Sequence, residues 1–367
     1  MARKVKYMEI YHRIKEQILA GEYRVGDRLP TEKEFADQYD VSVHTVRQAM
    51  ALFKTEGVIS KIAGSGTFVE AMPGAGGTQV VSAKNIGIVV WQRSRHIFPR
   101  ILPAIEETIF PHGYHNVVCN TGNDPQRERE VIERLIEQGI RGFIISPISW
   151  DEACLENYRY IQDRNIPLVM INRRARGIRA TSVSVNNAEA GYMATRRLLE
   201  AGHRKIGHLT SSAIRTELTD GRIRGYRRAL KDFDVPFDER LIVYDEGAEG
   251  AVSGLNGAAQ LLSRNPDVTG IFCVNDHHVP GLVQAAEKQG RRVPDDLSVV
   301  SFDQSMEIQA NLSFQLDTQK YPAVNVGICA AKELLAQIEG DDSMVKTIEL
   351  DPIPVHGHSC LEIPVPE

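Results

Sequence analysis

The pattern of hydrophobic and polar positions divides the chain into a short first part and a long second part. Over residues 7–18, apolar side chains follow the i, i+3, i+4, i+7 spacing of one helix face, and Gly21 supplies a stop. After a polar loop, Thr31 and Glu34 form the T-x-x-E pattern of a capping box. This pattern predicts a short second helix that buries Phe35.

A third helix is expected after the tight turn at 39–42, with Ser42 as its cap. Its apolar positions share one face, and they are Val46, Ala49, Met50 and Phe53. The stretch 58–69 places β-branched residues around a Gly-Ser-Gly turn, which predicts a hairpin. Three helices followed by a hairpin make a winged helix-turn-helix, and the third helix of such a unit fits the major groove of DNA.

The polar side chains outside this core are those that a DNA reader needs. Arg47 can bond guanine bidentately, whereas His44 and Thr45 can reach bases or phosphates. Lys61 in the hairpin can neutralise a phosphate. Arg47 or Lys61 alone equally suits an ordinary solvated surface. The specific signal is the combined order of helix, capped helix, short turn, polar-faced helix and glycine-tipped hairpin.

The second part of the chain has a different pattern of apolar and polar positions. Residues 71–84 have the composition of a linker, rich in glycine with one proline and few apolar anchors. From residue 85, short apolar runs such as "NIGIVV" and "GFIIS" alternate with amphipathic helical segments. Such runs are typical of strands covered on both faces, so the alternation predicts a parallel α/β sheet. The pattern restarts near residue 187, which predicts two Rossmann-like lobes with a cleft between them.

Polar residues that follow strands are the first candidates for a site, because ligands of such sheets bind beyond the carboxyl ends of the strands. They are Asn172, Asn275, Asp276 and Asp303, and Arg222 can add a guanidinium fork. These groups suit a polyhydroxylated ligand, since each hydroxyl both donates and accepts hydrogen bonds. The aromatic candidates for stacking on a sugar ring are Trp91, Phe98, Phe302 and Tyr321. Asp276 also fits a purely structural, helix-capping role.

Composition narrows the function classes. The net charge is −5, so any contact with nucleic acid has to be local. Five scattered cysteines without a C-x-x-C pair indicate neither a disulfide framework nor a cysteine-based zinc site. Cys273, His277 and His278 suggest zinc, but no closing ligand is evident. No catalytic, metal or cofactor constellation stands out, so we do not expect an enzyme. The chain lacks a signal peptide and a membrane-spanning run, so we expect a cytoplasmic protein without a membrane partner.

The first part resembles the DNA-binding domain of the GntR family of bacterial regulators. The resemblance covers roughly residues 5–70 and is carried by "GDRLPTEKEF" and "SVHTVRQAM", with the elements G-x-x-L-P-[ST]-E and T-V-R-x-A. It implies a start of the second helix, a recognition helix and a wing tip that face DNA. The residues so placed are Arg28, Thr31 and Glu32, then Ser42, His44, Thr45 and Arg47, and finally Gly66. Val43 stands where the family usually has arginine, so one family contact is missing and the family's usual operator is not implied.

Residues 85–365 resemble the effector domain of the LacI/GalR family, which is akin to periplasmic sugar-binding proteins. The resemblance is carried by "NNAEAGYMATRRLLEAGHRKIGHL", "RIRGYRRAL", "IFCVNDHHVPGLVQAAEKQGRRVPDDLSVVSFDQ" and "LDTQKYPAVNVG". It implies sugar contacts at Arg222, Asn275 and Asp303, and more weakly at Asn172, Ser94, His96 and Tyr321. The expected domains are 1–70, 71–84 as linker and 85–367. Within the last, the first lobe covers about 85–186 and 322–350, and the second lobe covers 187–321 and 351–367.

The joined reader and sensor resemble hybrid sugar-responsive repressors. That resemblance implies a repressor of sugar-utilisation genes which L-arabinose or a similar pentose releases from a palindromic operator in double-stranded DNA. A single reader offers few contacts, so we expect a homodimer. The main alternative is the same architecture that responds to another sugar or a nucleoside, or that acts as an activator. A reader fused to an aminotransferase-like domain would need a cofactor lysine and a longer chain, and a transport binding protein would need a signal sequence.

Overall fold

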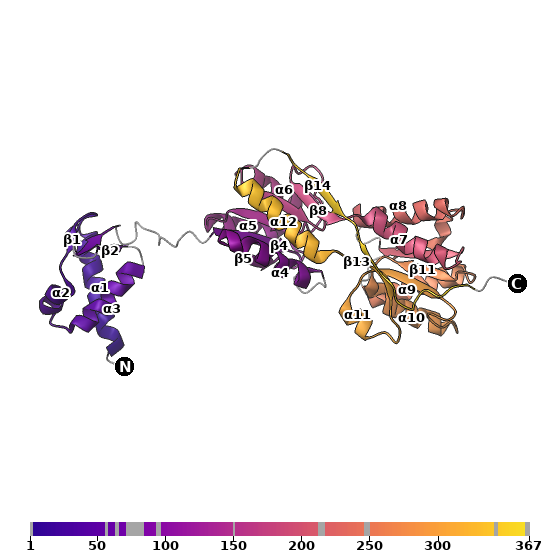
Figure 1. Cartoon of the computed structure of the whole chain (residues 1–367), viewed down its shortest axis with the longest axis horizontal. Helices are drawn as coiled ribbons and strands as arrows, with labels where there is room; N and C mark the ends of the chain where they lie inside the picture. Colours follow the sequence, from indigo (N-terminus) through magenta and orange to yellow (C-terminus); the bar gives the residue numbers. More distant parts are fainter. Residues whose placement is uncertain are drawn as a thin grey trace. The chain divides into compact units, whose positions relative to one another are not determined.

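A computed structural model gives the fold of the chain as two compact units, Met1–Lys84 and Asn85–Glu367 (Figure 1). The residues that it describes are 3–55, 58–62, 66–70, 84–92, 97–149, 151–211, 217–245, 250–340 and 344–363. The expected linker at 71–84 therefore lies outside the described residues except for its last position.

The first unit is built on three helices, α1 (Arg3–Leu19), α2 (Glu32–Tyr39) and α3 (Val43–Thr55). The capping box predicted for α2 is present: Oγ1 of Thr31 accepts from the backbone N–H of Glu34 at 3.2 Å, and the Glu34 carboxylate accepts from the N–H of Thr31 at 2.7 Å. The predicted apolar faces meet in one core, which contains Ile10, Ile14, Ile18, Phe35, Val46, Ala49, Met50 and Phe53. Burial of these faces orients the three helices.

A small antiparallel sheet completes this unit, with the strand order β1-β3-β2. The predicted hairpin is β2 (Ile59–Ile62) and β3 (Gly66–Val69). The third strand, β1 (Arg28–Leu29), was expected to be loop. It forms because Arg28 and Leu29 pair with Phe68 and Thr67, and Leu29 enters the core. The winged helix-turn-helix predicted from the sequence is confirmed.

The second unit contains two sheets. The first has the order β14-β8-β7-β6-β4-β5, and its pairs from β14 through β8, β7 and β6 to β4 are parallel. Its strands are β4 (Lys84–Val90), β5 (Tyr114–Asn120), β6 (Gly142–Ile145), β7 (Leu168–Ile171), β8 (Thr181–Val185) and β14 (Thr347–Leu350). Its helices are α4 (Phe98–Ile109), α5 (Pro125–Glu137), α6 (Glu152–Gln162) and α12 (Ala323–Ile338), with a 3-10 turn at η1 (Phe110–His112). Completely buried strands such as β6 account for the continuous apolar runs in the sequence.

The second sheet has the order β10-β9-β11-β12-β13-β15, and all its pairs are parallel except β13 with β15. Its strands are β9 (Ile206–Ser211), β10 (Ile242–Asp245), β11 (Gly270–Cys273), β12 (Ser298–Asp303), β13 (Asp317–Lys320) and β15 (Ile353–Val355). Its helices are α7 (Asn187–Glu200), α8 (Glu217–Asp232), α9 (Ala251–Arg264), α10 (Val279–Lys288) and α11 (Met306–Ala310), with 3-10 turns η2 (Glu239–Leu241) and η3 (Asp276–His278). This two-lobed α/β architecture is the predicted fold class.

The chain passes between the two sheets at three neighbouring connections (Figure 1). It leaves the first sheet between β8 and α7, returns between β13 and α12, and leaves again between β14 and β15. Asn186 ties two of these connections, because its backbone N–H donates to the Leu350 carbonyl at 2.8 Å and its side-chain amide to Asp351 at 3.3 Å. The carboxyl ends of the parallel strands in both lobes lie beside these connections.

Candidate functional sites: a nucleic-acid interface and an effector cleft

The DNA-facing residues predicted on α3 lie at its exposed start. Ser42, His44 and Arg47 are exposed, whereas Thr45 is half-buried. The hydroxyl of Ser42 accepts from the backbone N–H of Thr45 at 3.2 Å, as predicted for a cap, and lies 2.8 Å from the Thr45 hydroxyl. The start of α3 therefore presents a pair of hydroxyls beside the exposed imidazole of His44 and the exposed guanidinium of Arg47.

Glu32 joins the start of α2 to both the third helix and the wing. Its carboxylate lies 2.9 Å from Nε of Arg47 and 3.4 Å from Nζ of Lys61. Partial burial raises the pKa of Glu32, but the hydrogen bond from Arg47 and the positive charge of Lys61 outweigh burial, so the pKa is lowered overall. The carboxylate therefore stays ionised at neutral pH and holds two cations on one face of the unit.

Arg28 crosses the wing at Gly66. The φ angle of Gly66 is 122°, and a Cβ added there would lie 2.6 Å from Nε of Arg28. Glycine is therefore required both by the backbone conformation and by the close approach of the arginine. Thr31, the remaining predicted residue, caps α2 with its hydroxyl. The structure thus brings the predicted reader residues together as Arg28 with Gly66, Glu32 with Arg47 and Lys61, and Ser42 with Thr45.

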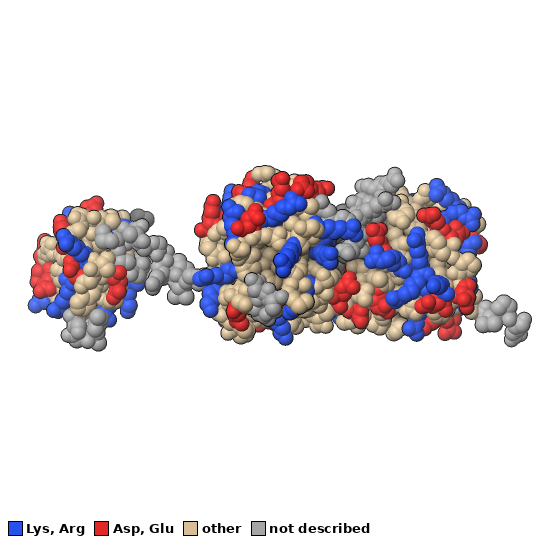
Figure 2. Space-filling model, turned by 90° about the horizontal axis from the view of Figure 1, so that it is seen from above, with Lys and Arg blue, Asp and Glu red and all other residues tan. Residues whose placement is uncertain are grey.

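Outside the reader, the surface offers no broad basic face in the view of Figure 2. Lysine and arginine side chains intermingle there with aspartate and glutamate over the second unit. The net charge of −5 agrees with this mixture. In the reader, the exposed side chains of Arg47 and Lys61 can contact a polyanion locally.

The second site is built at the carboxyl ends of β11, β12 and β13. Arg222 extends from α8, donates through Nε to Oδ1 of Asn187 at 3.1 Å, and donates through a terminal nitrogen to the Val274 carbonyl. Its guanidinium carbon lies 3.9 Å from the centre of the Phe302 ring. Phe302 is fully buried beneath this arginine, so its expected role as a stacking surface for the ligand is wrong.

Burial and charge compete at this site. Burial lowers the pKa of Arg222 to about 10, while the carboxylates of Asp303 and Asp276 and the nearby Tyr321 favour its charged form. Burial also raises the pKa of Tyr321, and the negative charge of Asp303 adds to that shift. At neutral pH the site therefore holds a guanidinium and a neutral phenol. Among the described residues, the buried hydroxyl of Tyr321 has no hydrogen-bond partner, which is costly without a ligand.

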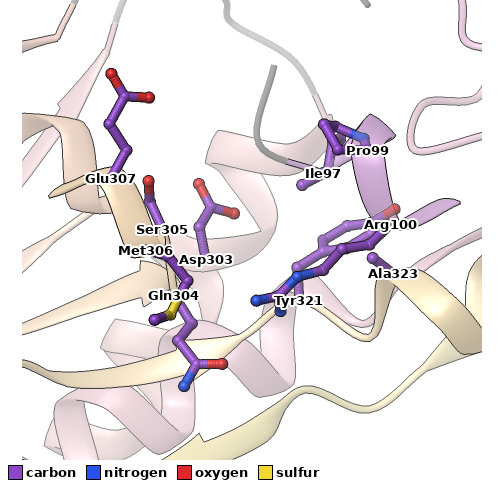
Figure 3. Close-up of a pocket in the computed structure, with 10 residues that line it drawn as sticks. All are labelled: Ile97, Pro99, Arg100, Asp303, Gln304, Ser305, Met306, Glu307, Tyr321 and Ala323. Atoms are coloured by element: carbon purple, nitrogen blue, oxygen red, sulfur yellow. The ribbon is translucent and has the colours of Figure 1, made fainter. Parts of the chain in front are cut away.

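A cavity of about 250 Å³ opens beside these residues (Figure 3). Asp303 and Tyr321 line it together with the segment after β12 and the start of α4, and its other lining residues are Ile97, Pro99, Arg100, Gln304, Ser305, Met306, Glu307 and Ala323. Figure 3 shows the Asp303 carboxylate between the side chains of the segment after β12 on one side and those of Ile97, Pro99 and Tyr321 on the other. Asp303 and Gln304 have φ angles of 115° and 61°, which aspartate and glutamine adopt rarely, and such strain gathers at ligand sites. Elements of both lobes therefore border one cavity.

The other predicted effector residues do not line this cavity or lie outside the described residues. Asn275 follows β11 directly after Val274, whose carbonyl Arg222 contacts. Asn172 is buried at the carboxyl end of β7 in the first lobe, with a φ of 64°, and it does not line the cavity. Ser94 and His96 lie outside the described residues. The sequence reasoning missed Asn187, Arg100 and Glu307, since no strand end or spacing pointed to them.

Asp276 has a structural role, which was one of the two roles open to it. Its carboxylate accepts from the Ser301 hydroxyl, from the Thr318 hydroxyl at 3.1 Å and from the Ser305 backbone N–H at 2.6 Å. Burial, with a contribution from the Asp303 charge, raises its pKa to about 7. Asp276 thus fixes the ends of three neighbouring strands rather than the ligand.

The metal alternative is not supported by the geometry. Both ring nitrogens of His278 lie within 2.9 Å of protein oxygens, Oδ1 of Asn275 and Oγ of Ser253. In the part of the chain that the structure describes, no three His, Cys, Asp or Glu side chains are grouped to hold a metal ion. Across the same residues, no helix is both long and apolar enough to cross a membrane.

A winged helix with a cationic face, joined to a two-lobed domain with a cavity between its lobes, defines a ligand-responsive DNA-binding regulator. Comparison with known families agrees. Residues 6–69 match the gntR family of bacterial regulatory proteins, and residues 83–354 match the family of periplasmic binding proteins and the sugar-binding domain of the LacI family. The chain belongs to this LacI-type family and carries a GntR-type reader. It is a sugar-responsive transcriptional repressor and not an enzyme.

Individual relatives match this chain over much of its length. The chain is 33% identical over 340 residues to an arabinose metabolism transcriptional repressor of Geobacillus stearothermophilus, with 91% of each chain covered. It is 29% identical to the protein of the same name from Halalkalibacterium halodurans, with 91% of this chain and 89% of that one covered. Among solved structures, the regulator CcpA of Lactococcus lactis matches with a TM-score of 0.67 at 22% identity, over 76% of this chain and 99% of that one.

Proposed function

We propose that this protein represses sugar-utilisation genes and leaves its operator when L-arabinose, or a similar pentose, binds between the lobes of the second unit. One observation carries the proposal: Asp303 and Tyr321, whose buried hydroxyl has no hydrogen-bond partner among the described residues, line a cavity that α4 of the other lobe also borders. The buried Arg222 interacts electrostatically with both of these side chains. Fixed charged and neutral polar groups in one small space suit a neutral polyol. The names of the relatives, which are arabinose metabolism repressors, favour L-arabinose.

The proposed mechanism is ligand-coupled release from DNA. A sugar that contacts Asp303 on one side and the start of α4 on the other favours a closed arrangement of the lobes. We propose that the second unit forms a homodimer that holds two readers at the spacing of a palindromic operator, and that closure changes this spacing. The coupling is reciprocal: if sugar weakens operator binding a hundredfold, or by about 2.7 kcal/mol, the operator weakens sugar binding equally.

The reader residues act in this mechanism at the DNA. We propose that Arg47 and His44 contact base edges or phosphates from α3, and that Arg28, Lys61 and the Gly66 tip contact the backbone from the wing. Ser42, Thr45, Thr31 and Glu32 hold these groups in place. Support comes from the exposure of the cations, from the ion pairs of Glu32 with Arg47 and Lys61, and from the contact between the Ser42 and Thr45 hydroxyls. The Thr31 hydroxyl accepts from the backbone N–H of Glu34 and so caps α2.

The test combines a ligand screen with a DNA assay. Thermal unfolding of the full chain is followed with L-arabinose, D-xylose, D-ribose, a hexose and nucleosides, because a ligand that binds only the folded state raises the melting temperature. The effective compound is then titrated against the chain on DNA selected from a random library. We expect L-arabinose to stabilise the protein and to release the DNA. Stabilisation by another sugar or a nucleoside would support the alternative effector, and tighter DNA binding would indicate a corepressor. DNA affinity unchanged by every bound compound would refute the switch.

A further inference from the structure

Arg100 brings a positive charge of the first lobe to the cavity between the lobes. It lies in the first turn of α4 and lines the cavity together with Asp303, which ends β12 in the second lobe. Figure 3 shows its side chain reaching from α4 towards Asp303 and Gln304. Among the described residues, the Arg100 guanidinium has no hydrogen-bond or ion-pair partner. Its N–H donors are therefore available to a ligand in the cavity.

The backbone that carries Arg100 is fixed to the first lobe. Phe98 and Ile101, on either side of it, are completely buried in the core of that lobe. Helix α4 also packs closely on α12, since a Cβ added at Gly327 would lie 2.7 Å from the carbonyl oxygen of Ile101. In so dense a contact, the start of α4 moves only together with the lobe. The base of the Arg100 side chain therefore follows any movement of the first lobe.

The carboxylate opposite Arg100 is fixed to the second lobe. Asp303 ends β12, and two residues later the backbone N–H of Ser305 donates to the buried carboxylate of Asp276 at 2.6 Å. Glu307 is the other acidic residue that lines the cavity, but it is exposed, and Figure 3 shows its carboxylate directed away from Asp303. Arg100 and Asp303 are thus a cation and an anion that two lobes present to the same space.

The chemistry of this pair selects the group that can lie between them. A guanidinium only donates hydrogen bonds and a carboxylate only accepts them, whereas a hydroxyl does both. One sugar hydroxyl can therefore donate to Asp303 and accept from Arg100, and both hydrogen bonds are strengthened by charge. An ammonium group can donate to Asp303 but is repelled by Arg100, and a carboxylate group on the ligand is repelled by Asp303.

We propose that Arg100 is a specificity-determining residue, which together with Asp303 selects a neutral hydroxyl of the effector and rejects a charged group at the same position. This proposal rests on the proposed function of the cleft. Because the two side chains belong to different lobes, the bridged hydroxyl also stabilises the closed arrangement. The effector class is therefore a neutral polyol, and amino sugars with the amine at this position and sugar acids with the acid there are excluded.

The experiment measures, by calorimetry, the affinity of the full chain for L-arabinose and for its monodeoxy analogues, in which each hydroxyl is removed in turn. Arg100→Met keeps an unbranched side chain without the charge. It should weaken L-arabinose binding about tenfold, the lower end for a hydrogen bond to a charged group. For the one analogue that lacks the bridged hydroxyl, Arg100→Met and the unsubstituted protein should differ less than about twofold, because no bond remains to be lost.

A second ligand tests the selection by charge. The analogue with an ammonium group in place of the bridged hydroxyl should bind Arg100→Met more tightly than the unsubstituted protein, since the repulsion is gone. A merely structural role of Arg100 would not reverse the sign of the effect between two ligands. Arg127→Met is the matched control, because Arg127 is exposed on α5 of the same lobe and does not line the cavity. Thermal unfolding and DNA binding without sugar show that each variant is folded.

The outcomes separate this proposal from the proposed function. L-arabinose affinity of Arg100→Met within twofold of the unsubstituted protein would overturn the role of Arg100 alone. An equal loss for L-arabinose and every deoxy analogue would do the same, because no particular hydroxyl would then depend on the guanidinium. Absence of any sugar binding by the unsubstituted protein would overturn the proposed function and this inference together.

Discussion

The reader and the sensor both place a cation beside a carboxylate, but in opposite surroundings. In the reader, the side chains of Arg47 and Lys61 are each 64% exposed and share one carboxylate, that of Glu32. In the sensor, Arg222 is 8% exposed, donates two hydrogen bonds and lies against Phe302. Exposed ion pairs are weak and rearrange easily, which suits a polyanion that varies along its length. A buried, fully oriented guanidinium suits one small ligand in one pose.

The comparison extends to the carboxyl groups. Neighbouring cations lower the pKa of Glu32 despite its partial burial, whereas burial raises the pKa of Asp276 to about 7. The reader therefore holds an ionised carboxylate between exposed cations, whereas the sensor contains a buried carboxyl that is partly protonated at neutral pH. The two proposed ligands therefore need different dielectric environments: accessible charge suits DNA, and desolvated, pre-oriented groups suit a sugar.

The largest expected effect is at the buried arginine. Arg222→Ala should lower the affinity for L-arabinose by about 100-fold, because it removes a desolvated charge and leaves its partners unpaired. The variant should also stay on its DNA at sugar concentrations that release the unsubstituted protein. Calorimetry and an operator-release titration measure the two effects. DNA affinity without sugar should be unchanged, and sugar affinity within twofold of the unsubstituted protein would show that the pocket lies elsewhere.

A smaller effect is expected at the exposed arginine. Arg47→Ala should weaken binding to the selected DNA about 10- to 100-fold by loss of a bidentate contact, while sugar affinity is kept. Fluorescence anisotropy of labelled DNA provides the measurement. Arg13→Ala is the matched control, since Arg13 is also exposed and paired, with Glu9 at 3.1 Å on α1. An equal loss in both variants would contradict a specific role for α3.

The raised pKa of Asp276 should make part of the protein's stability depend on pH. A carboxyl whose pKa is raised on folding stabilises the folded state below its unfolded pKa near 4, and this contribution is lost as the pH rises through about 7. The contribution of Asp276 to the free energy of unfolding should therefore fall between pH 5 and pH 8, and Asp276→Asn should remove that contribution. Glu128, whose pKa burial also raises to about 7, adds a fall of the same sign, whereas His208, whose pKa burial lowers to about 4, opposes it at acidic pH. Both tryptophans, Trp91 and Trp150, lie in the second unit, so urea unfolding followed by their fluorescence reports on it.

Glu32→Gln is the control for this prediction. Because the pKa of Glu32 is lowered, its ion pairs stabilise the reader above its unfolded pKa and are lost as the pH falls. The tryptophan fluorescence should not report that change, since no tryptophan lies in the first unit. A profile for Asp276→Asn as steep as that of the unsubstituted protein would assign the pH dependence to other groups.

The smallest effect is expected at the wing. Lys61→Ala should weaken DNA binding only a few-fold, and equally for selected and unrelated sequences, because a phosphate contact carries no sequence information. The slope of log affinity against log salt should flatten by about one unit. Anisotropy titrations at several salt concentrations measure that slope. Loss confined to the selected sequence would instead make Lys61 a base contact.

Much of this protein was predictable because the signals are local. The capping box of Thr31 and Glu34 closes within three residues, and Ser42 caps α3 over the same distance. The apolar runs of the parallel strands predicted the sheets, and the polar residues after these runs identified Asn275 and Asp303 at strand ends. Such features depend on helix and strand geometry, which a sequence encodes within a few positions.

Local sequence patterns predicted the winged helix, the two lobes and most of the side chains proposed to bind ligands. The partners of those side chains depend on tertiary packing: Glu32 meets Arg47 and Lys61 from 15 and 29 positions away, and Phe302 lies under Arg222. The short strand β1 likewise forms only because the wing supplies its partner. Contacts between distant segments depend on how whole elements pack, and burial then sets the charge and orientation of each group.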